Sequence, residues 1–195
     1  PSPVKASDIA VRVGTSWIDK ELYKEFFCEL IGMPYYYREG VELYYNKHDG
    51  SWRIDRTQYA RNYGGMNVTS VYGTSRANAY RLFEDCLNQR STQIYDTVLD
   101  ADGREKRVLN NSETVAAREK QNKIVEAFKD WIFRDPIRRD ELETIYNRLF
   151  NQIRLPKYDG SYLRFPEMNP AIELRPHQKD AVHRIITSGN TLLHH

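Results

Sequence analysis

The sequence predicts an α+β fold: a mainly helical module with two β-hairpins, followed by one further helix and strand. Apolar residues recur at helical spacing in four segments between residues 16 and 150, which indicates four helices. In two other places, short segments of alternating apolar and polar residues flank turn-forming sequences, Asn46–Gly50 and Asp102–Gly103. We therefore expect these helices and hairpins to form one module over residues 1–150.

The composition is that of an ordinary soluble globular protein. Of the 195 residues, 40% are hydrophobic and 29% are charged. The net charge of +2 is too small to indicate nucleic-acid binding by itself. Cys28 and Cys86 fit no disulfide or metal-ligand pattern, which weakly favours a reducing compartment. No apolar run approaches the ~18–20 residues of a membrane span, and no basic-then-apolar leader opens the chain. We expect a cytoplasmic protein without a membrane partner.

The first half of the module is predicted to contain a helix, a hairpin and a second helix. The first helix covers residues 17–31, the hairpin covers residues 41–54, and residues 55–73 are interpreted as a loop. Thr74 is expected to cap the second helix, over residues 75–89. The apolar positions that define the first helix are Leu22, Phe26 and Leu30. Those expected to face inward from the second are Ala79, Leu82, Phe83 and Cys86.

The second half is predicted to contain another hairpin and two more helices. The hairpin joins residues 93–99 to residues 107–109 through a two-residue Asp-Gly turn. A helix over residues 112–134 begins at a capping box made by Asn110 and Glu113, and its charged first half is expected to face solvent. Asp135-Pro136 starts a helix that continues to residue 150. The expected inward residues are Ile124, Val125, Phe128, Trp131 and Ile132 in the first helix, and Leu142, Ile145, Leu149 and Phe150 in the second.

Residues 151–172 are interpreted as a connector, because they are rich in proline and too long for an ordinary loop in a compact domain. Pro176 then occupies the first position of a predicted helix, where its missing N–H costs nothing. Gly189 is predicted to end that helix, and Thr191–Leu193 to form a short buried strand. The apolar face of the helix contains Ala181, Val182, Ile185 and Ile186.

The segment Leu174-Arg175-Pro176-His177-Gln178, with the predicted helix and strand, resembles the opening of the motor core in superfamily-two helicases and translocases. These include Swi/Snf-type and DEAD-like proteins. In such motors the glutamine reads the adenine of ATP, and the strand leads into the phosphate-binding Gly-x-Gly-Lys-Thr loop (Walker A). The sequence ends at His195, before any such loop. The resemblance implies that residues 173–195 are the truncated start of an ATPase domain that uses ATP and magnesium when intact. The fragment alone is expected neither to bind ATP tightly nor to hydrolyse it.

This resemblance assigns three candidate cofactor-binding residues. Gln178 would bind the adenine edge, because a side-chain amide presents a donor and an acceptor together. Arg175 would approach the nucleotide, and Phe165 would stack on the adenine, as an upstream aromatic residue does in the resembled families. Structural interpretations stay open. Gln178 can be an ordinary exposed helical residue, and Arg175 can cap a neighbouring element. Phe165, like Tyr158 and Tyr162, can simply pack the connector against the core.

A second resemblance covers nearly the whole chain. The stretches Tyr72–Tyr80, Ala127–Ile132 and Tyr158–Ser161 resemble a region of very large proteins from bacterial conjugative elements and phages. Those proteins are identified as combined adenine-specific DNA methylases and Swi/Snf-type helicases, with this region between the methylase part and the motor. The resemblance implies a parent that translocates on or unwinds DNA with ATP and is coupled to DNA methylation. Its implied partners are DNA and the remainder of the motor. The glycine-rich loop and the Asn/Asp-Pro-Pro-Tyr-type motif of a methylase are absent from the sequence, so no catalytic residue is assigned.

A second group of residues is a candidate for nucleic-acid contact. Arg53, Arg56 and Arg61 occur close to Trp52 and Tyr59 in the sequence. Arginine can bind phosphate and aromatic rings can stack on exposed bases, although the same residues can serve packing alone. No metal site is predicted. The histidines lack zinc-ligand spacing, and turn formation explains the aspartates around the second hairpin.

Two other functional classes are compatible with the sequence. The chain can be a non-catalytic DNA-binding or protein-docking module, in which the terminal helix only packs. A strongly salt-dependent affinity for DNA would favour the DNA-binding form. It can also be a scaffold without any ligand. In each case the apolar face of the terminal helix would lack a covering sheet, so self-association through that helix is expected.

Overall fold

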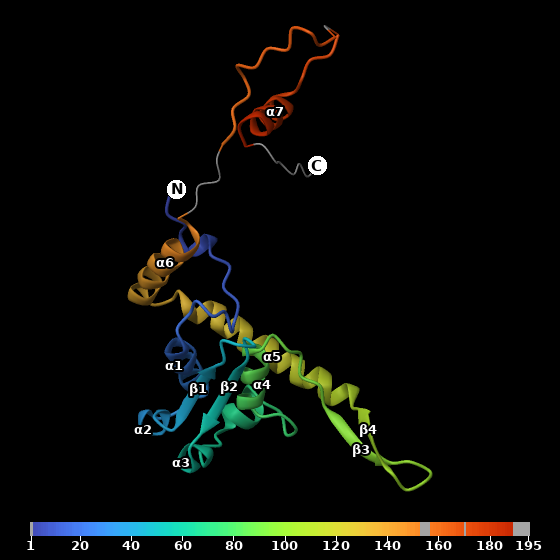
Figure 1. The fold of residues 1–195 in the computed structure, drawn as a ribbon. Coiled ribbons are helices and arrows are strands. Elements are labelled where there is room, and N and C mark those ends of the chain that lie inside the picture. Colours follow the sequence, from blue (N-terminus) through green and yellow to red (C-terminus); the bar gives the residue numbers. More distant parts are fainter. Residues whose placement is uncertain (1, 153–156, 170, 189–195) are drawn as a thin grey trace. The chain divides into compact units, whose positions relative to one another are not determined.

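The computed structural model describes residues 2–152, 157–169 and 171–188. These residues form two compact units, Ser2–Asn151 and the segment that follows from Gln152. The predicted α+β class is confirmed, since the described residues combine helices with two separate antiparallel hairpins (Figure 1). Within the described ranges, no helix combines the length and apolar character that a membrane span needs.

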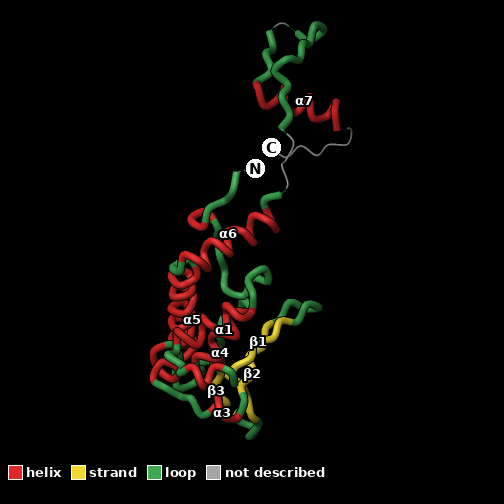
Figure 2. Tube along the Cα trace, turned by 90° about the vertical axis from the view of Figure 1, so that its left-hand side faces the viewer, coloured by secondary structure: helices red, strands yellow, loops and turns green. Residues whose placement is uncertain are grey.

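Three helices form the centre of the first unit: α1 (Lys20–Leu30), α4 (Ala79–Leu87) and α5 (Asn111–Ile132). Both α1 and α4 pack on α5 (Figure 2). Aromatic rings fill the space between them. Phe27 stacks on Phe83 at 4.6 Å, and Phe128 contacts Phe26 edge-on at 5.1 Å. Such ring pairs add about 0.5–1.5 kcal/mol each beyond the burial of their area.

Helices α4, α5 and α6 (Pro136–Phe150) begin at side-chain caps, but the cap of α4 was misplaced in the prediction. Half of the predicted capping box forms: the Asn110 side chain accepts the N–H of Glu113, but the Asn110 N–H donates to the carbonyl of Ile94 instead of the Glu113 side chain. Thr74 does not cap α4. It forms its own turn by accepting the N–H of Ala77, and α4 begins four residues later than predicted, where Asn78 accepts the N–H of Arg81. Asparagine competes well for the cap position, and the Thr74 turn delays the helix until Asn78.

Two inward faces differ from the prediction. In α1, the fully buried residues include Tyr23 and Phe27, whereas Leu22 and Leu30 are half-buried, because the first hairpin and the other helices cover α1 on more than one side. The first half of α5 is not solvated all round. It buries Thr114, Ala117 and Gln121. In α4, all four residues predicted to face inward are buried (Ala79, Leu82, Phe83 and Cys86).

The first hairpin is confirmed as β1 (Val41–Tyr45) paired with β2 (Trp52–Arg56). Val41 and Leu43 are buried and their neighbours Glu42 and Tyr44 are exposed, as the alternation predicted. The segment between this hairpin and α4 is more ordered than the predicted loop. It contains α3 (Gln58–Arg61) and a single π-helical turn, η2 (Asn67–Val71), and a further short helix, α2 (Tyr35–Arg38), precedes the hairpin.

The second hairpin pairs β3 (Tyr95–Leu99) with β4 (Glu105–Leu109). Its turn is longer than the predicted two-residue turn. Leu99 pairs with Glu105, the N–H of Asp100 donates to the carbonyl of Arg104, and Gly103 takes φ 75°. A three-residue loop that ends in a left-handed glycine is a common alternative to the two-residue turn.

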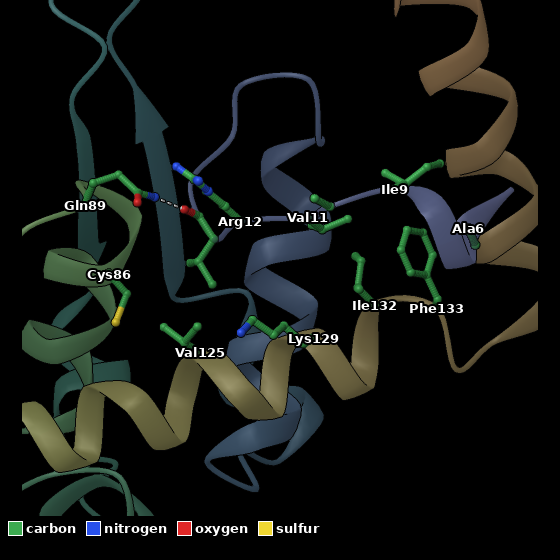
Figure 3. Close-up of a pocket in the computed structure, with 12 residues that line it drawn as sticks. Ala6, Ile9, Val11, Arg12, Cys86, Gln89, Val125, Lys129, Ile132 and Phe133 are labelled. Atoms are coloured by element: carbon green, nitrogen blue, oxygen red, sulfur yellow. Dashed lines mark hydrogen bonds between the residues drawn. The ribbon is translucent and has the colours of Figure 1, made fainter. Parts of the chain in front are cut away.

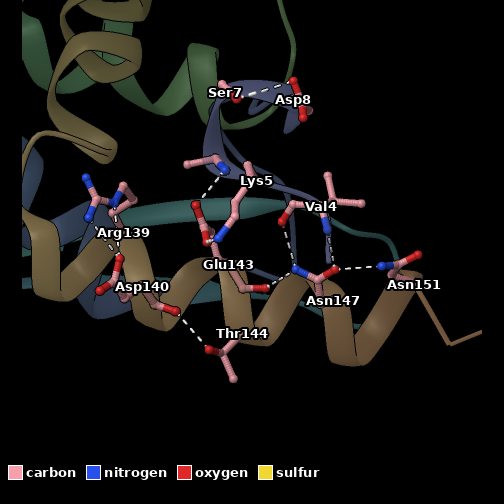
Figure 4. A network of polar contacts seen from close by, with 11 residues as sticks. Val4, Lys5, Ser7, Asp8, Arg139, Asp140, Glu143, Thr144, Asn147 and Asn151 are labelled. Carbon is pink, nitrogen blue, oxygen red and sulfur yellow. Dashed lines mark hydrogen bonds and ion pairs between the residues drawn. The ribbon is translucent and has the colours of Figure 1, made fainter. Parts of the chain in front are cut away.

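Helix α6 (Pro136–Phe150) begins at Asp135 and Pro136, as predicted. Of its predicted inward residues, Leu142 is buried, but Leu149 and Phe150 are 52% and 55% exposed, so that part of the prediction was wrong. The last turns of α6 instead hold the start of the chain through polar contacts. The side-chain amide of Asn147 donates to the carbonyl of Val4 and accepts its N–H, and Glu143 accepts the N–H of Ala6 beside η1 (Ala6–Asp8) (Figure 4).

The second unit contains α7 (Pro176–Ser188), which starts at the predicted proline. No residue of α7 is buried, and Ile185 and Ile186 are 46% and 66% exposed. The predicted stop at Gly189 and the predicted strand Thr191–Leu193 lie outside the described residues.

Candidate functional site

The first turn of α7 presents Gln178 at the surface. Its side-chain Oε1 accepts the backbone N–H of Arg175 at 2.9 Å. Arg175 directly precedes the helix and Gln178 is its third residue, so this contact is the back-reaching half of a capping box. The carbonyl oxygen has a second lone pair, and within the described chain the Nε2 group donates to no residue. Both N–H donors and one acceptor lone pair of the amide are therefore available to a ligand.

The other two nucleotide candidates are less well placed. Arg175 is exposed and forms no ion pair with any residue that the structure describes. Phe165 is half-buried, and its carbonyl accepts the N–H of Met168. The aromatic contacts to α7 come instead from Tyr158 and Tyr162, which approach the His183 ring edge-on at 6.1 Å and 5.5 Å. In these contacts, the two tyrosines pack the connector against α7 and not against the core.

A glycine explains how the connector meets α7. The N–H of Gly160 donates to Asp180 Oδ1 at 2.8 Å. A Cβ atom at Gly160 would lie 2.0 Å from the carbonyl oxygen of Lys179, so only glycine allows the connector to approach so closely. The stretch Tyr158–Ser161 is therefore the segment that holds the connector against α7.

Three of the five nucleic-acid candidates, Trp52, Arg53 and Arg56, already have partners within the fold. Trp52 is 5% exposed, its Nε1 donates to the carbonyl of Gly14, and its ring contacts Tyr23 in the core. Its buried ring cannot stack on a base, so the prediction that Trp52 contacts nucleic acid was wrong. The alternation of β2 places Trp52 on the same inward face as Ile54, and that face packs on the core. Arg53 is exposed but forms an ion pair with Asp55 at 2.6 Å.

Arg56 is stacked rather than free. Its guanidinium lies 3.9 Å from the centre of the Tyr80 ring. Tyr80 is 4% exposed, and burial raises the pKa of its phenol to about 12, although the charge of Arg56 acts in the opposite direction. The stacked pair closes one side of the core, and the arginine reaches the surface only in part.

The remaining two candidates, Tyr59 and Arg61, lie on α3 in a group of tyrosines that sequence reasoning did not assemble. Tyr59 is 53% exposed and stacks on Tyr37 of α2 at 4.4 Å, with 23° between the ring planes. Tyr37 also contacts Tyr36 and Tyr63. We call these rings, with the neighbouring Tyr35, the tyrosine surface. The sequence feature that could have predicted this surface is the run of three tyrosines directly after Pro34, because the helical turn that they form lies close to α3.

A cavity of about 580 Å³ lies between the chain's first segment and α5 (Figure 3). Its walls are mainly apolar, with the polar side chains of Arg12, Gln89 and Lys129 also contributing. The Cys86 thiol forms part of the wall, and burial raises its pKa to about 12. The thiol is therefore protonated at neutral pH and is no nucleophile. Among the described residues, no three His, Cys, Asp or Glu side chains gather closely enough to hold a metal ion.

Comparison with known proteins identifies the family. Residues 12–152 match the family model of a domain of unknown function, DUF8437. The matched range ends one residue beyond the first compact unit, Ser2–Asn151. No curated protein and no solved structure matches the chain. The chain therefore belongs to the DUF8437 family.

Proposed function

We propose that this chain is part of an ATP-dependent DNA helicase or translocase of a mobile element, linked to DNA methylation. In this proposal the DUF8437 domain is an accessory module, and residues 173–188 open the ATP-binding motor. The observation that carries the proposal is the exposed amide of Gln178, in the first turn of a 13-residue helix that begins at Pro176. The resemblance of Leu174–Gln178 to helicase motors points to the same amide.

The amide suits adenine because its two groups match the two groups on the adenine edge. The Oε1 atom can accept from the exocyclic amine while it also accepts the N–H of Arg175, and the Nε2 group can donate to the adjacent ring nitrogen. Capping by Oε1 holds the side chain at the helix start before any ligand arrives. This restraint lowers the entropy lost on binding.

The exposed apolar face of α7 fits the same proposal. Ile185 and Ile186 lie on the surface of a helix that buries none of its residues. A helix with such a face is stable chiefly when a larger domain covers it. The phosphate-binding loop and the magnesium ligands would belong to that larger domain, and this chain alone would not hydrolyse ATP.

The test uses a longer polypeptide of the parent protein that continues past residue 195, assayed for DNA-stimulated ATPase activity. Gln178→Ala removes both the cap and the adenine contact. Gln178→Glu keeps a cap acceptor for Arg175 but replaces the donor that adenine needs. If Gln178 reads adenine, both variants raise the KM for ATP, by about tenfold for one lost hydrogen-bonded contact.

Two results would refute the proposal. One is a longer polypeptide without any DNA-stimulated ATPase activity, which would leave a non-catalytic DNA-binding or docking module. The other is a KM that rises only in Gln178→Ala, because that pattern assigns Gln178 to helix capping alone.

A further inference from the structure

We propose that the tyrosine surface binds single-stranded DNA, with unpaired bases stacked on Tyr36 and Tyr59 and a backbone phosphate held by Arg61. This inference rests on the proposed function for its choice of polymer, since a DNA translocase or helicase works beside unpaired bases. The exposed fractions of the outer rings set the surface apart from the aromatic core. They are 79% for Tyr35, 64% for Tyr36 and 53% for Tyr59.

Several contacts join the two short helices that carry the tyrosine surface. Helices α2 and α3 pack against each other, and the N–H of Thr57 donates to the carbonyl of Gly40 at 2.9 Å. A Cβ atom at Gly40 would lie 2.8 Å from the Cβ of Ala60, so glycine permits this close approach. The hydroxyl of Tyr63 donates to the carbonyl of Gly32 at 2.8 Å and fixes the inner ring. The backbone that carries the outer rings is therefore already held in place before a base stacks on them.

The charge around the surface suits a polyanion. Residues 56–83 contain four arginines and no aspartate or glutamate. Three of these arginines are engaged within the fold: Arg56 on Tyr80, Arg76 with Asp96, and Arg81 with backbone carbonyls. Arg61, two residues after Tyr59, has no ion-pair partner within the described part of the chain.

The two helices themselves carry three charged groups close to the rings. Arg38 and Glu39 lie at the end of α2, and Arg61 ends α3. The Nε of Arg38 donates to the carbonyl of Met33, and Arg38 lines a pocket beside Tyr35 together with Glu21, Glu25 and Glu39. Because carboxylates surround Arg38, the positive charge that this surface offers to a phosphate is that of Arg61 at the end of α3.

Single strands fit this geometry better than duplex DNA. Helices α2 and α3 have four residues each, too short to lie along a major groove and read base edges. Exposed rings can stack on any unpaired base, because every base has a π-face. Tyrosine and arginine also dominate protein interfaces, so a protein partner is the competing outcome that the experiment must separate.

The experiment measures fluorescence anisotropy of a labelled oligothymidylate of about 15 nucleotides, titrated with the 195-residue chain. We expect binding that weakens with salt and that an unlabelled duplex of equal length competes for poorly. Tyr59→Ala and Tyr36→Ala should each weaken binding about tenfold, whereas Tyr59→Phe should bind nearly as the wild type does, because a phenyl ring still stacks. Tyr95→Ala is the matched control, since Tyr95 is also exposed but lies on β3.

Arg61→Gln supplies an independent readout. Loss of one phosphate contact should weaken binding and lower the slope of log affinity against log salt by about 0.7 for a single strand. Circular dichroism of each variant excludes loss of the fold. The proposal is overturned if Tyr59→Ala binds as tightly as Tyr95→Ala, if the duplex competes equally well, or if the chain binds no single strand. Binding here requires neither ATP nor residues after 188, so its failure is distinguishable from failure of the Gln178 test.

Discussion

Replacing Gln121 by alanine is expected to destabilise the DUF8437 module by about 2–4 kcal/mol. Gln121 is 7% exposed on α5, and its amide holds the chain that leaves α4. Its Oε1 accepts the N–H of Thr92 and its Nε2 donates to the carbonyl of Arg90, both at 2.9 Å. The sequence therefore uses one polar side chain to satisfy two backbone groups at a turn.

The magnitude follows from what each partner loses. Thr92 is 2% exposed, so its N–H stays buried without an acceptor, at a cost of about 1–3 kcal/mol. Arg90 is exposed, so water can replace the lost donor and the cost there is about 0.5–1.5 kcal/mol. With a urea m-value of about 2 kcal/mol/M, the midpoint of unfolding should fall by about 1–2 M.

The assay is urea unfolding followed by circular dichroism, with Asn122→Ala as the matched control. Asn122 is the exposed neighbour on the same helix, and its replacement should not lower stability, because alanine favours a helix more than asparagine does. Equal midpoints for Gln121→Ala and Asn122→Ala would refute the reasoning. A further variant, Gln121→Glu, keeps the acceptor for Thr92 but turns a carboxylate toward the carbonyl of Arg90. Its destabilisation should diminish as the pH falls and the carboxyl becomes protonated.

Two other predictions concern stability. Gly14→Ala should lower the free energy of unfolding by at least about 2 kcal/mol, because Gly14 takes φ 86° and a Cβ would lie 2.0 Å from the carbonyl oxygen of Leu87. Gly103→Ala should lower it by only about 1 kcal/mol, because Gly103 takes φ 75° but has open space around it. Equal losses of stability in thermal unfolding would contradict this prediction. Alkaline pH should favour unfolding, because burial raises the pKa of Cys86 from 9.0 to about 12 and the unfolded thiol therefore ionises first. Between pH 9.0 and about 12, the free energy of unfolding of the wild type should fall with rising pH more steeply than that of Cys86→Ala, by about 1.4 kcal/mol per pH unit. An equal pH dependence of stability in the two proteins would contradict this prediction.

Much of the fold was predictable because local patterns coincide with packing. The alternation of Val41 and Leu43 predicted a hairpin, and those residues are buried. Pro136 and Pro176 marked the starts of two helices correctly. Short elements were missed because a four-residue helix such as α3 leaves no periodicity to detect.

The predictions that failed depended on tertiary context. Periodicity alone placed Phe150 inward, but α6 uses its last turns to hold the start of the chain through Asn147, and Phe150 stays exposed. Trp52 is close to arginines in the sequence, yet the pleat of β2 directs its side chain toward the core. Nearness along a strand does not place neighbouring side chains on one face, because they alternate.

The candidate site was predictable only in part. Gln178 stood out because of its sequence neighbours, but its capping contact with Arg175 is visible only in the structure. The tyrosine surface depends on α2 and α3 meeting across a hairpin, so Tyr37 and Tyr59 are 22 positions apart in the sequence but 4.4 Å apart in space. No local pattern connects such residues.

The role of Gln178 in adenine binding can be tested by nucleotide discrimination. The affinities of ATP and GTP for the longer polypeptide would be measured for the wild type, Gln178→Glu and Gln178→Ala, with the amide exchange of α7 as a check that the helix persists. We expect the wild type to prefer ATP by about tenfold or more, as one paired amide contact allows. Gln178→Glu should lose this preference while α7 stays protected. An ATP preference that survives in Gln178→Glu, or that is absent from the wild type, would contradict the assignment of Gln178 to adenine.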